Sequence, residues 1–313
     1  MKRGLQLLFI GYLLRLNLFG LLKGEVYPGF FLVDVLHCIG LSLILLIGLY
    51  LLTAKANRRV FSILLVTITI VLFLWEPWYK NWSFSWMPTA MANYFTKAHG
   101  SVFTIIPWLG YTTFGAFLSL LFTKYRQSKY LYPIAISLSL IVGCYLIFLA
   151  SPLFDALYQL SDFSLFLDIQ ANNYLFIRLG NVLVIMAIFM LFRALLQHTT
   201  LLRIGSSTLS IYIVHFIVLY GSFTGLGLYK FFHHSLNPWI TVIGAALFMV
   251  VCTFLALRYE ELKAPFKLKI GATVRYIQLQ LRWTTRKTLQ LVREQLLPKL
   301  RLFLFRLFAS SRN

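Results

Sequence analysis

The sequence has 313 residues, of which 59% are hydrophobic and 12% charged, with a mean hydropathy of +0.78 and a net charge of +20. Soluble domains carry roughly 25% charged residues, so this composition excludes an ordinary soluble domain. The basic excess fits Lys and Arg that flank membrane spans, and we expect no nucleic-acid partner because no zinc-finger or RNA-binding signature accompanies it.

Eight apolar stretches are long enough to cross a membrane. A hydrocarbon core about 30 Å thick needs roughly 20 apolar residues in a helix. The stretches are 4–22, 33–53, 60–78, 101–122, 131–150, 174–196, 208–228 and 238–257. They predict an all-α, polytopic integral membrane protein of about eight transmembrane helices in a domain over 1–257, followed by a basic tail over 258–313. The first stretch contains Arg15 and is interpreted as a retained span, not a cleaved signal peptide.

The distribution of positive charge predicts an orientation. Alternate connecting segments carry nine Lys and Arg on one side and four on the other, before the tail is counted. The nine are Lys2, Arg3, Lys55, Arg58, Arg59, Lys124, Arg126, Lys129 and Arg203. Because positive residues are retained in the cytoplasm, we expect a multi-pass protein of the inner (plasma) membrane with both termini cytoplasmic.

Two outer segments and the tail predict contact with the membrane surface. The segments 75–100 and 151–173 are too aromatic for linkers and are expected to form interfacial helices, either as an aromatic belt or as a lid over an outward-facing site. The tail holds 13 Lys and Arg against 3 Glu. Its apolar residues recur at helical spacing until Pro298, before a second stretch over 300–308. This pattern predicts basic amphipathic helices on membrane lipids, with partner binding as the alternative.

The three cysteines predict no metal centre. Cys38, Cys144 and Cys252 lie in separate apolar stretches without CxxC spacing. That arrangement provides neither a disulfide framework nor a zinc ligand set. We expect them to be buried small hydrophobic residues.

Asp34 and His37 are the candidate catalytic pair. They are three residues apart at the outer end of the second span and therefore share a helical face. A carboxylate beside an imidazole fixes its tautomer and raises its basicity, as general-base chemistry on a hydroxyl or amine requires. The structural alternative is an interfacial Asp that caps the helix beside a His bonded to a neighbouring carbonyl.

Further ionisable residues near the outer ends of spans predict a polar cavity. Charged groups within spans are costly and usually face a cavity or a partner. The candidates are Arg15, Glu76, His99 and Arg178. They either converge with Asp34 and His37, or Arg15 and Arg178 only neutralise Asp34 and Glu76.

A third candidate site lies where the seventh span begins. Ser206 or Ser207 is a natural N-cap, and free helix N-terminal amides beside Arg203 suit a phosphate arriving from the cytoplasm. Tyr212 and His215 share a face about two turns further into the membrane. A His within a span serves either as a proton relay or as a hydrogen-bonded link between helices.

Four stretches of the sequence resemble membrane-embedded acyltransferases, and the closest group is the bacterial relatives of heparan-alpha-glucosaminide N-acetyltransferase. The late-span motif runs from Gly205 through Thr208-Leu209-Ser210-Ile211-Tyr212 to His215. The other three stretches are Arg3-Gly4-Leu5-Gln6-Leu7 with Ile10-Gly11-Tyr12, Asp34-Val35-Leu36-His37-Cys38-Ile39-Gly40-Leu41, and Pro107-Trp108-Leu109-Gly110-Tyr111 with Gly115-Ala116. Their order over residues 3–215 is the order found in that group.

The resemblance implies transfer of an acetyl group from cytoplasmic acetyl-CoA to an amine or hydroxyl of an envelope glycan beyond the membrane. His37 and Asp34 would then act at the outer side, with Arg203, Ser206, Ser207, Tyr212 and His215 near the acyl-CoA donor. The group usually begins with an Asp-x-x-Arg-Gly span followed by a His, ahead of the region where this sequence starts. Either the reading frame begins late or the protein is an N-terminally shortened relative, and in both cases we expect that His37 does not inherit that histidine's role. The alternatives are a transporter or flippase for an envelope glycan or lipid carrier, and an inactive membrane scaffold.

Overall fold

The computed structural model describes residues 1–55, 57–233 and 235–291, and their regular structure is helical. The helices are α1 (Lys2–Leu14), α2 (Leu18–Leu22), η1 (Pro28–Phe31), α3 (Val35–Leu52), α4 (Arg58–Leu74), α5 (Glu76–Tyr79), α6 (Thr89–Ala92), α7 (Ile105–Lys124), α8 (Leu131–Phe148), α9 (Ala150–Ser161), α10 (Ser164–Ala171), α11 (Tyr174–Leu191), η2 (Leu195–Gln197), α12 (Thr199–Ser206), α13 (Thr208–Tyr220), α14 (Leu228–Phe232) and α15 (Pro238–Leu291). Within the described ranges the only β-type pairing is an isolated bridge between Asn17 and Phe223.

The predicted class is confirmed: the protein is an all-α, polytopic membrane protein. Among the described residues, five helices are long and apolar enough to cross a membrane, over Gly29–Leu52, Ile105–Lys124, Leu131–Phe148, Tyr174–Leu191 and Pro238–Lys263. The other three predicted spans correspond to α1, α4 and α13, which have 13, 17 and 13 residues. A bend of 61° separates α12 from α13, and counting this pair as one broken span raises the total to six.

The first predicted span is divided because two of its residues leave the helix for polar partners. α1 ends before Arg15, whose side chain bonds to Asp34. Asn17 then caps α2 by accepting from the Gly20 amide at 3.2 Å. The backbone between the two helices also pairs with residue 223, because the Leu18 amide donates to the Phe223 carbonyl oxygen at 2.9 Å. A continuous helix over 4–22 would lose these bonds.

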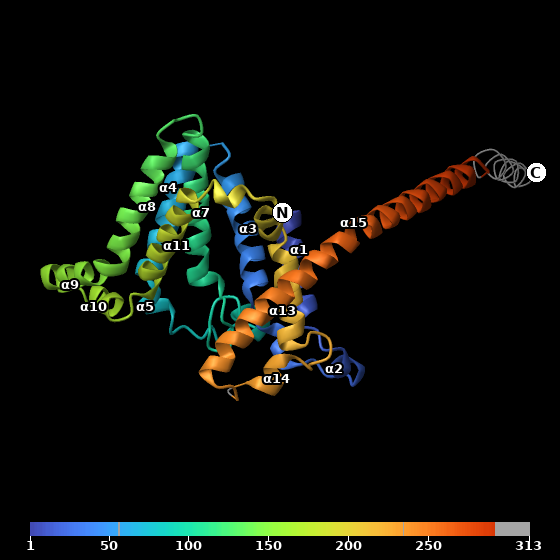
Figure 1. The fold of residues 1–313 in the computed structure, drawn as a ribbon, viewed down its shortest axis with the longest axis horizontal. Helices are drawn as coiled ribbons and strands as arrows, with labels where there is room; N and C mark the ends of the chain where they lie inside the picture. The colour runs from blue at the N-terminus through green and yellow to red at the C-terminus, as the bar shows by residue number, and fades with distance from the viewer. Residues whose placement is uncertain (56, 234, 292–313) are drawn as a thin grey trace, which may run out of the picture. The chain divides into compact units, whose positions relative to one another are not determined.

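The chain divides into two compact units, Met1–Ser206 with His215–Thr241, and Ser207–Val214 with the chain from Val242 onward. Within the first unit, α1 packs on α3, α3 and α4 pack on α7, and α8 packs along α11 (Figure 1). Glycines allow the close crossings: a Cβ on Gly40 would lie 2.8 Å from the Gly4 carbonyl oxygen, and one on Gly180 would lie 2.6 Å from that of Gly143. Small residues have this role in membrane helix pairs generally.

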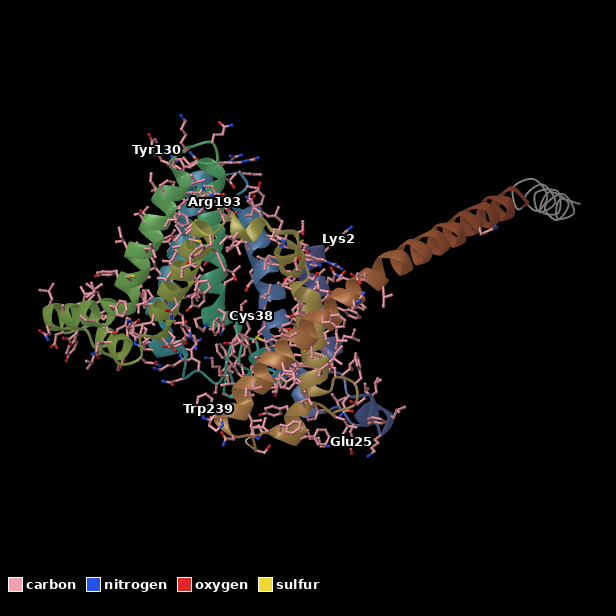
Figure 2. The ribbon with its side chains drawn as sticks, in the orientation of Figure 1. Lys2, Glu25, Cys38, Tyr130, Arg193 and Trp239 are labelled. Atoms are coloured by element: carbon pink, nitrogen blue, oxygen red, sulfur yellow. The ribbon has the colours of Figure 1, made fainter. Side chains whose placement is uncertain are left out.

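The two ends of the first unit have different structures. Tyr130 and Arg193 lie toward one end, where short loops connect the long helices, and Glu25 lies toward the other (Figure 2). That second end carries α2, η1, α5, α9 and α10 (Figure 1).

The two aromatic segments differ from each other. The segment 151–173 forms α9 and α10, which pack through Ala150, Phe154, Leu165 and Ile169, so the predicted helices are confirmed there. The segment 75–100 contains only the four-residue helices α5 and α6, joined by turns, and its predicted helical character is largely wrong. The indoles of Trp75, Trp78, Trp82 and Trp86 are all exposed.

The helix α15 continues past residue 257 to Leu291. In the second unit it is joined to α13 by a partly buried polar contact, in which the Ser210 hydroxyl donates to Glu260. The tail stretch 300–308 lies outside the described residues, and the amphipathic contact of the tail with lipid stays a prediction. Of the cysteines, Cys38 and Cys252 are buried as expected, whereas Cys144 is exposed. The interpretation of all three as buried residues is therefore wrong for Cys144, which lies on an outward face of α8.

Candidate functional site

Arg15 and Asp34 form a two-point ion pair at the start of α3. Arg15 Nε donates to Asp34 Oδ2 at 2.6 Å, and Nη2 donates to Oδ1 at 2.7 Å. Its Nη1 donates to the Gly29 carbonyl oxygen at 2.6 Å. The two side chains are 17% and 18% exposed, so the pair is largely screened from solvent. Bidentate Arg–carboxylate bonds are among the strongest and most directional in proteins. This pair fixes the residue that caps α3.

Asp34 and His37 form the capping box of α3. The Asp34 backbone amide donates to His37 Nδ1 at 3.2 Å. An amide N–H can only donate, so Nδ1 must present its lone pair, and the proton of the neutral imidazole is then on Nε2. The imidazole does not donate to the Asp34 carboxylate, which accepts from Arg15 instead. Asp34 therefore positions His37 through its main chain.

The imidazole of His37 is fully enclosed by aromatic rings and by α1. Its exposure is 0%. The Tyr12 ring lies edge-on at 4.4 Å between centroids, and the Tyr94 ring lies at 6.4 Å. α1 crosses so closely that a Cβ on Gly11 would lie 2.8–3.0 Å from three imidazole atoms. Only a glycine at position 11 leaves room for the ring in this rotamer.

His37 Nε2 is a buried polar atom with no hydrogen-bond partner among the described residues. Nearby, the hydroxyls of Tyr12 and Tyr94 bond to each other at 2.7 Å. Burial, together with the hydrogen bond to Tyr12, raises the pKa of Tyr94, so this hydroxyl stays protonated. Buried polar groups are nearly always paired. The unpaired Nε2–H of His37 is therefore an exception that calls for an explanation.

The segment before α7 covers this site. Ser101 Oγ accepts from the Val33 amide at 3.0 Å, and Asn93 donates to the Phe31 carbonyl oxygen at 2.8 Å. Tyr94 comes from the same segment. Its buried side chains face η1 and the start of α3, while its indoles are exposed. The segment thus covers His37 on its buried side and exposes its indoles on the other, while its role as an aromatic belt or as a lid stays a prediction.

The other predicted cavity residues have different environments. Glu76 is buried and accepts from the Tyr174 hydroxyl at 3.2 Å. Arg178 lies over the rings of Trp108 and Tyr174, at 5.5 and 5.3 Å from their centroids. The predicted Arg178–Glu76 ion pair is not among the salt bridges of the described residues. His99 is exposed. Of the six outer residues, the structure brings Arg15, Asp34 and His37 together.

The five residues predicted to lie near the acyl-CoA are divided between the two units. Arg203, Ser206 and His215 belong to the first unit, and Ser207 and Tyr212 belong to the second. Ser207 is buried at the break between α12 and α13, the position expected for an N-cap. The Ser206 hydroxyl donates to the Arg203 carbonyl oxygen at 2.9 Å.

Two residues of the site, Tyr12 and Tyr94, were not predicted from the sequence, and a sequence pattern marks only the first. Tyr12 lies three residues before Arg15 and within a motif that resembles acyltransferases, so its helical face could have been recognised. Tyr94 is 82 residues away from Tyr12 in the chain. No local pattern marks Tyr94, because its position depends on how the segment before α7 folds back.

Comparison with known proteins assigns the family. The family model described as acyltransferase domain matches residues 1–258. The chain belongs to this acyltransferase family. No curated protein and no solved structure matched the chain. The match includes the capping box, the crossing of α1 and the segment that covers His37, so the whole site lies within the acyltransferase domain.

Proposed function

We propose that this acyltransferase-family protein transfers an acyl group, acetyl in the simplest case, from cytoplasmic acyl-CoA to an amine or hydroxyl of an envelope glycan. The observation that carries the proposal is the unpaired Nε2–H of a buried His37 within a domain of this family. The four motifs given above support a relation to the bacterial relatives of heparan-alpha-glucosaminide N-acetyltransferase. Arg203, Ser206, Ser207, Tyr212 and His215 are proposed to contact the donor.

The reaction assigns a specific task to His37. The acceptor oxygen or nitrogen attacks the thioester carbonyl, a new C–O or C–N bond forms, and the C–S bond breaks. The acceptor's proton leaves with the CoA thiol. Negative charge develops on the carbonyl oxygen, and a fixed N–H donor stabilises it. The His37 Nε2–H is such a donor without a change of tautomer, whereas general-base action at Nε2 would require a proton on Nδ1 and loss of the bond from the Asp34 amide.

Arg15 and Asp34 are positioning residues in this proposal. The guanidinium holds the Asp34 carboxylate, Asp34 caps α3, and its amide orients the imidazole. Tyr12 and Tyr94 close the space beside the ring and exclude water. A dry site strengthens each hydrogen bond made to the developing charge.

Two substitutions at position 37 separate its chemical role from its structural one. His37→Gln keeps the capping box, because a glutamine at this position also accepts from the N-cap amide, and its amide N–H can still donate. His37→Ala removes both functions. We expect acetyl-CoA-dependent transfer in membranes to fall by about 100-fold in H37A, as for loss of one oxyanion donor, and by only about tenfold in H37Q.

The matched control is His233→Ala, an exposed histidine at the end of α14, which should transfer at the wild-type rate. Equal losses of transfer in H37Q and H37A, with both proteins folded in detergent, would assign base chemistry to His37. That result would overturn its role as a hydrogen-bond donor to the carbonyl oxygen. Unchanged transfer in both would remove His37 from the reaction. Binding of CoA to the purified protein is the separate test of the donor, and no binding would favour a transporter.

We also propose an orientation, with the end of the first unit that carries Tyr130 and Arg193 in the cytoplasm of the inner membrane and the His37 end outside. The charge bias of the connecting segments supports it. Single cysteines at Ser128 and Ser161, introduced after the three native cysteines are replaced by serine, should label from opposite sides of sealed membranes. Labelling of both from one side would contradict the topology.

A further inference from the structure

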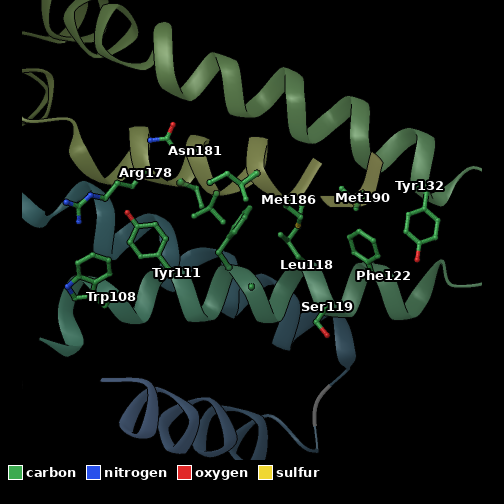
Figure 3. Close-up of a pocket in the computed structure, with 15 residues that line it drawn as sticks. Trp108, Tyr111, Leu118, Ser119, Phe122, Tyr132, Arg178, Asn181, Met186 and Met190 are labelled. Carbon is green, nitrogen blue, oxygen red and sulfur yellow. The ribbon is translucent and has the colours of Figure 1, made fainter. Parts of the chain in front are cut away.

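A groove runs along the surface between α7 and α11 (Figure 3). Its volume is about 910 Å³, near the upper end of the range for pockets that bury whole small molecules. Apart from Arg178, Asn181 and Ser119, its lining is aromatic, aliphatic or methionine, with Leu118, Phe122 and Met186 as examples. Several lining residues, among them Gly115, Val182 and Ile185, are exposed, so the groove opens sideways along helices that cross the membrane. Hydrocarbon chains can enter it from the bilayer.

One end of the groove is polar. Arg178 lies there over the face of Trp108 (Figure 3), and it also lies over the face of Tyr174. Within the part of the chain that the structure describes, no carboxylate forms a salt bridge with Arg178. Trp108 Nε1–H at the same end is buried without an acceptor among the described residues. An unpaired guanidinium and an unpaired N–H donor in a membrane-spanning region suit an anion with several acceptor oxygens.

The groove is longer than one leaflet. Trp108 at the Arg178 end and Phe122 at the opposite end are fourteen residues apart on α7, which is about 21 Å along a helix. Half of the hydrocarbon core is about 15 Å. The tail of an ordinary phospholipid ends near the bilayer midplane, so it would leave the Phe122 end unfilled. A single, longer apolar tail fills the whole groove.

We propose that this groove binds a polyprenyl-type lipid phosphate, with its phosphate on Arg178 and Trp108 and its tail along α7 and α11. The phosphate then lies at the same end of the first unit as His37. Cys38 Sγ contacts the Thr104 carbonyl oxygen at 3.6 Å, which joins the start of α3 to the start of α7. The Tyr111 hydroxyl donates to the Leu175 carbonyl oxygen at 2.9 Å, which joins the start of α11 to the same part of α7.

A lipid phosphate held there could carry the sugar that accepts the acyl group. That role rests on the proposed function, whereas binding of the lipid does not. The experiment therefore measures binding alone, so that loss of lipid binding and loss of acyl transfer are distinguished.

The binding test uses the full-length protein in detergent micelles and native mass spectrometry with three probes. Undecaprenyl phosphate has the phosphate and the long tail, undecaprenol lacks the phosphate, and dioleoylphosphatidylglycerol has a phosphate with shorter tails. We expect undecaprenyl phosphate to bind about tenfold more tightly than undecaprenol, the gain typical of a hydrogen-bonded charge. It should also displace the phosphatidylglycerol.

Two variants test the phosphate contact and the tail contact separately. Arg178→Gln should weaken the binding of undecaprenyl phosphate about tenfold and leave the binding of undecaprenol unchanged. Gly115 lies midway along the groove, and a Cβ there would meet no atom within 4 Å. Gly115→Leu therefore fills the groove without disturbing the fold and should abolish binding of both long lipids. The matched control is Gly48→Leu on α3, where an added Cβ also meets nothing within 4 Å.

The proposal is overturned if G115L binds undecaprenyl phosphate as wild type does, since the tail then lies elsewhere. It is also overturned if R178Q has no effect on that lipid, or if phosphatidylglycerol binds equally well and the groove takes any anionic lipid of the bilayer. Equal loss in G48L and G115L would assign the effect to helix packing instead of to the groove.

Discussion

Two arginines lie near the same end of the first unit, and their surroundings are opposite. Arg15 uses its guanidinium on the Asp34 carboxylate and the Gly29 carbonyl oxygen. Arg178 has two aromatic faces and no salt bridge within the described residues. Charged groups in spans are costly unless paired or placed in a cavity. Arg15 is therefore part of the scaffold around His37, whereas the guanidinium of Arg178 is the one we propose for a ligand.

The same contrast extends to the space around each arginine. Next to Arg15, α1 crosses α3 so closely that Gly11 touches the imidazole of His37. Next to Arg178, the surface between α7 and α11 stays open over about 910 Å³. A closed site suits a reacting group that must be held in one rotamer, and an open groove suits a flexible tail that exchanges with the bilayer.

The largest expected effect is a difference in the free energy of unfolding between the variants of the two arginines. Arg15→Gln leaves the Asp34 carboxylate without its cation in a largely buried place, and it should lower the free energy of unfolding by about 3 kcal/mol. Arg178→Gln removes only cation–π contacts and should cost no more than about 1 kcal/mol. Thermal unfolding in detergent measures both. The double variant R15Q/D34N should recover part of the loss, and equal melting temperatures for R15Q and R178Q would contradict the comparison.

A smaller effect is expected from adding one methyl group in each region. Gly11→Ala places a Cβ within 3.0 Å of the His37 ring, so it should destabilise by about 1–3 kcal/mol, the usual cost of overpacking, and also reduce acyl transfer. Gly115→Ala meets no atom within 4 Å and should be neutral or stabilising by up to about 1 kcal/mol, because alanine favours helix. Full activity in G11A would show that the imidazole is not held as described.

The smallest expected effect concerns the tyrosine pair and pH. Tyr94→Phe removes the 2.7 Å bond to Tyr12 and should cost about 1 kcal/mol at neutral pH. Burial raises the pKa of Tyr94 above its unfolded value, so its contribution is complete below about pH 10 and decreases as the pH rises further. The Y94F variant should therefore lose less stability than wild type between neutral pH and pH 11. A steeper alkaline loss in Y94F would contradict the burial of this hydroxyl.

Much of the fold could be predicted because lipid imposes a simple rule on sequence. Long apolar runs must be helices, and five of the predicted spans are confirmed as such among the described residues. The rule fails where a polar residue has a specific partner. Arg15 and Asn17 interrupt a run of suitable length, because bonds to Asp34 and to the Gly20 amide replace the continuous helix.

The candidate site was predictable in part for a similar reason. The spacing of Asp34 and His37 places both at the start of one helix, and the capping box follows from that spacing. Spacing does not say which atoms bond, so the carboxylate was expected on the imidazole and lies on Arg15 instead. Tyr94 and the groove beside Arg178 had no signal at all, since both depend on segments that meet only after folding.

The sequence by itself determined that this protein lies in lipid and that its fold is helical. It also identified the residues able to carry charge or a proton inside the membrane. Hydrophobic run length and side-chain chemistry are local properties, and they are legible one stretch at a time. Only the tertiary structure decided which arginine is paired, which nitrogen of His37 is left for a substrate, and where the surface stays open. Those outcomes depend on the contacts between α1 and α3 and between α7 and α11, and hydrogen-bond partners are chosen by distance in space, not by separation along the chain.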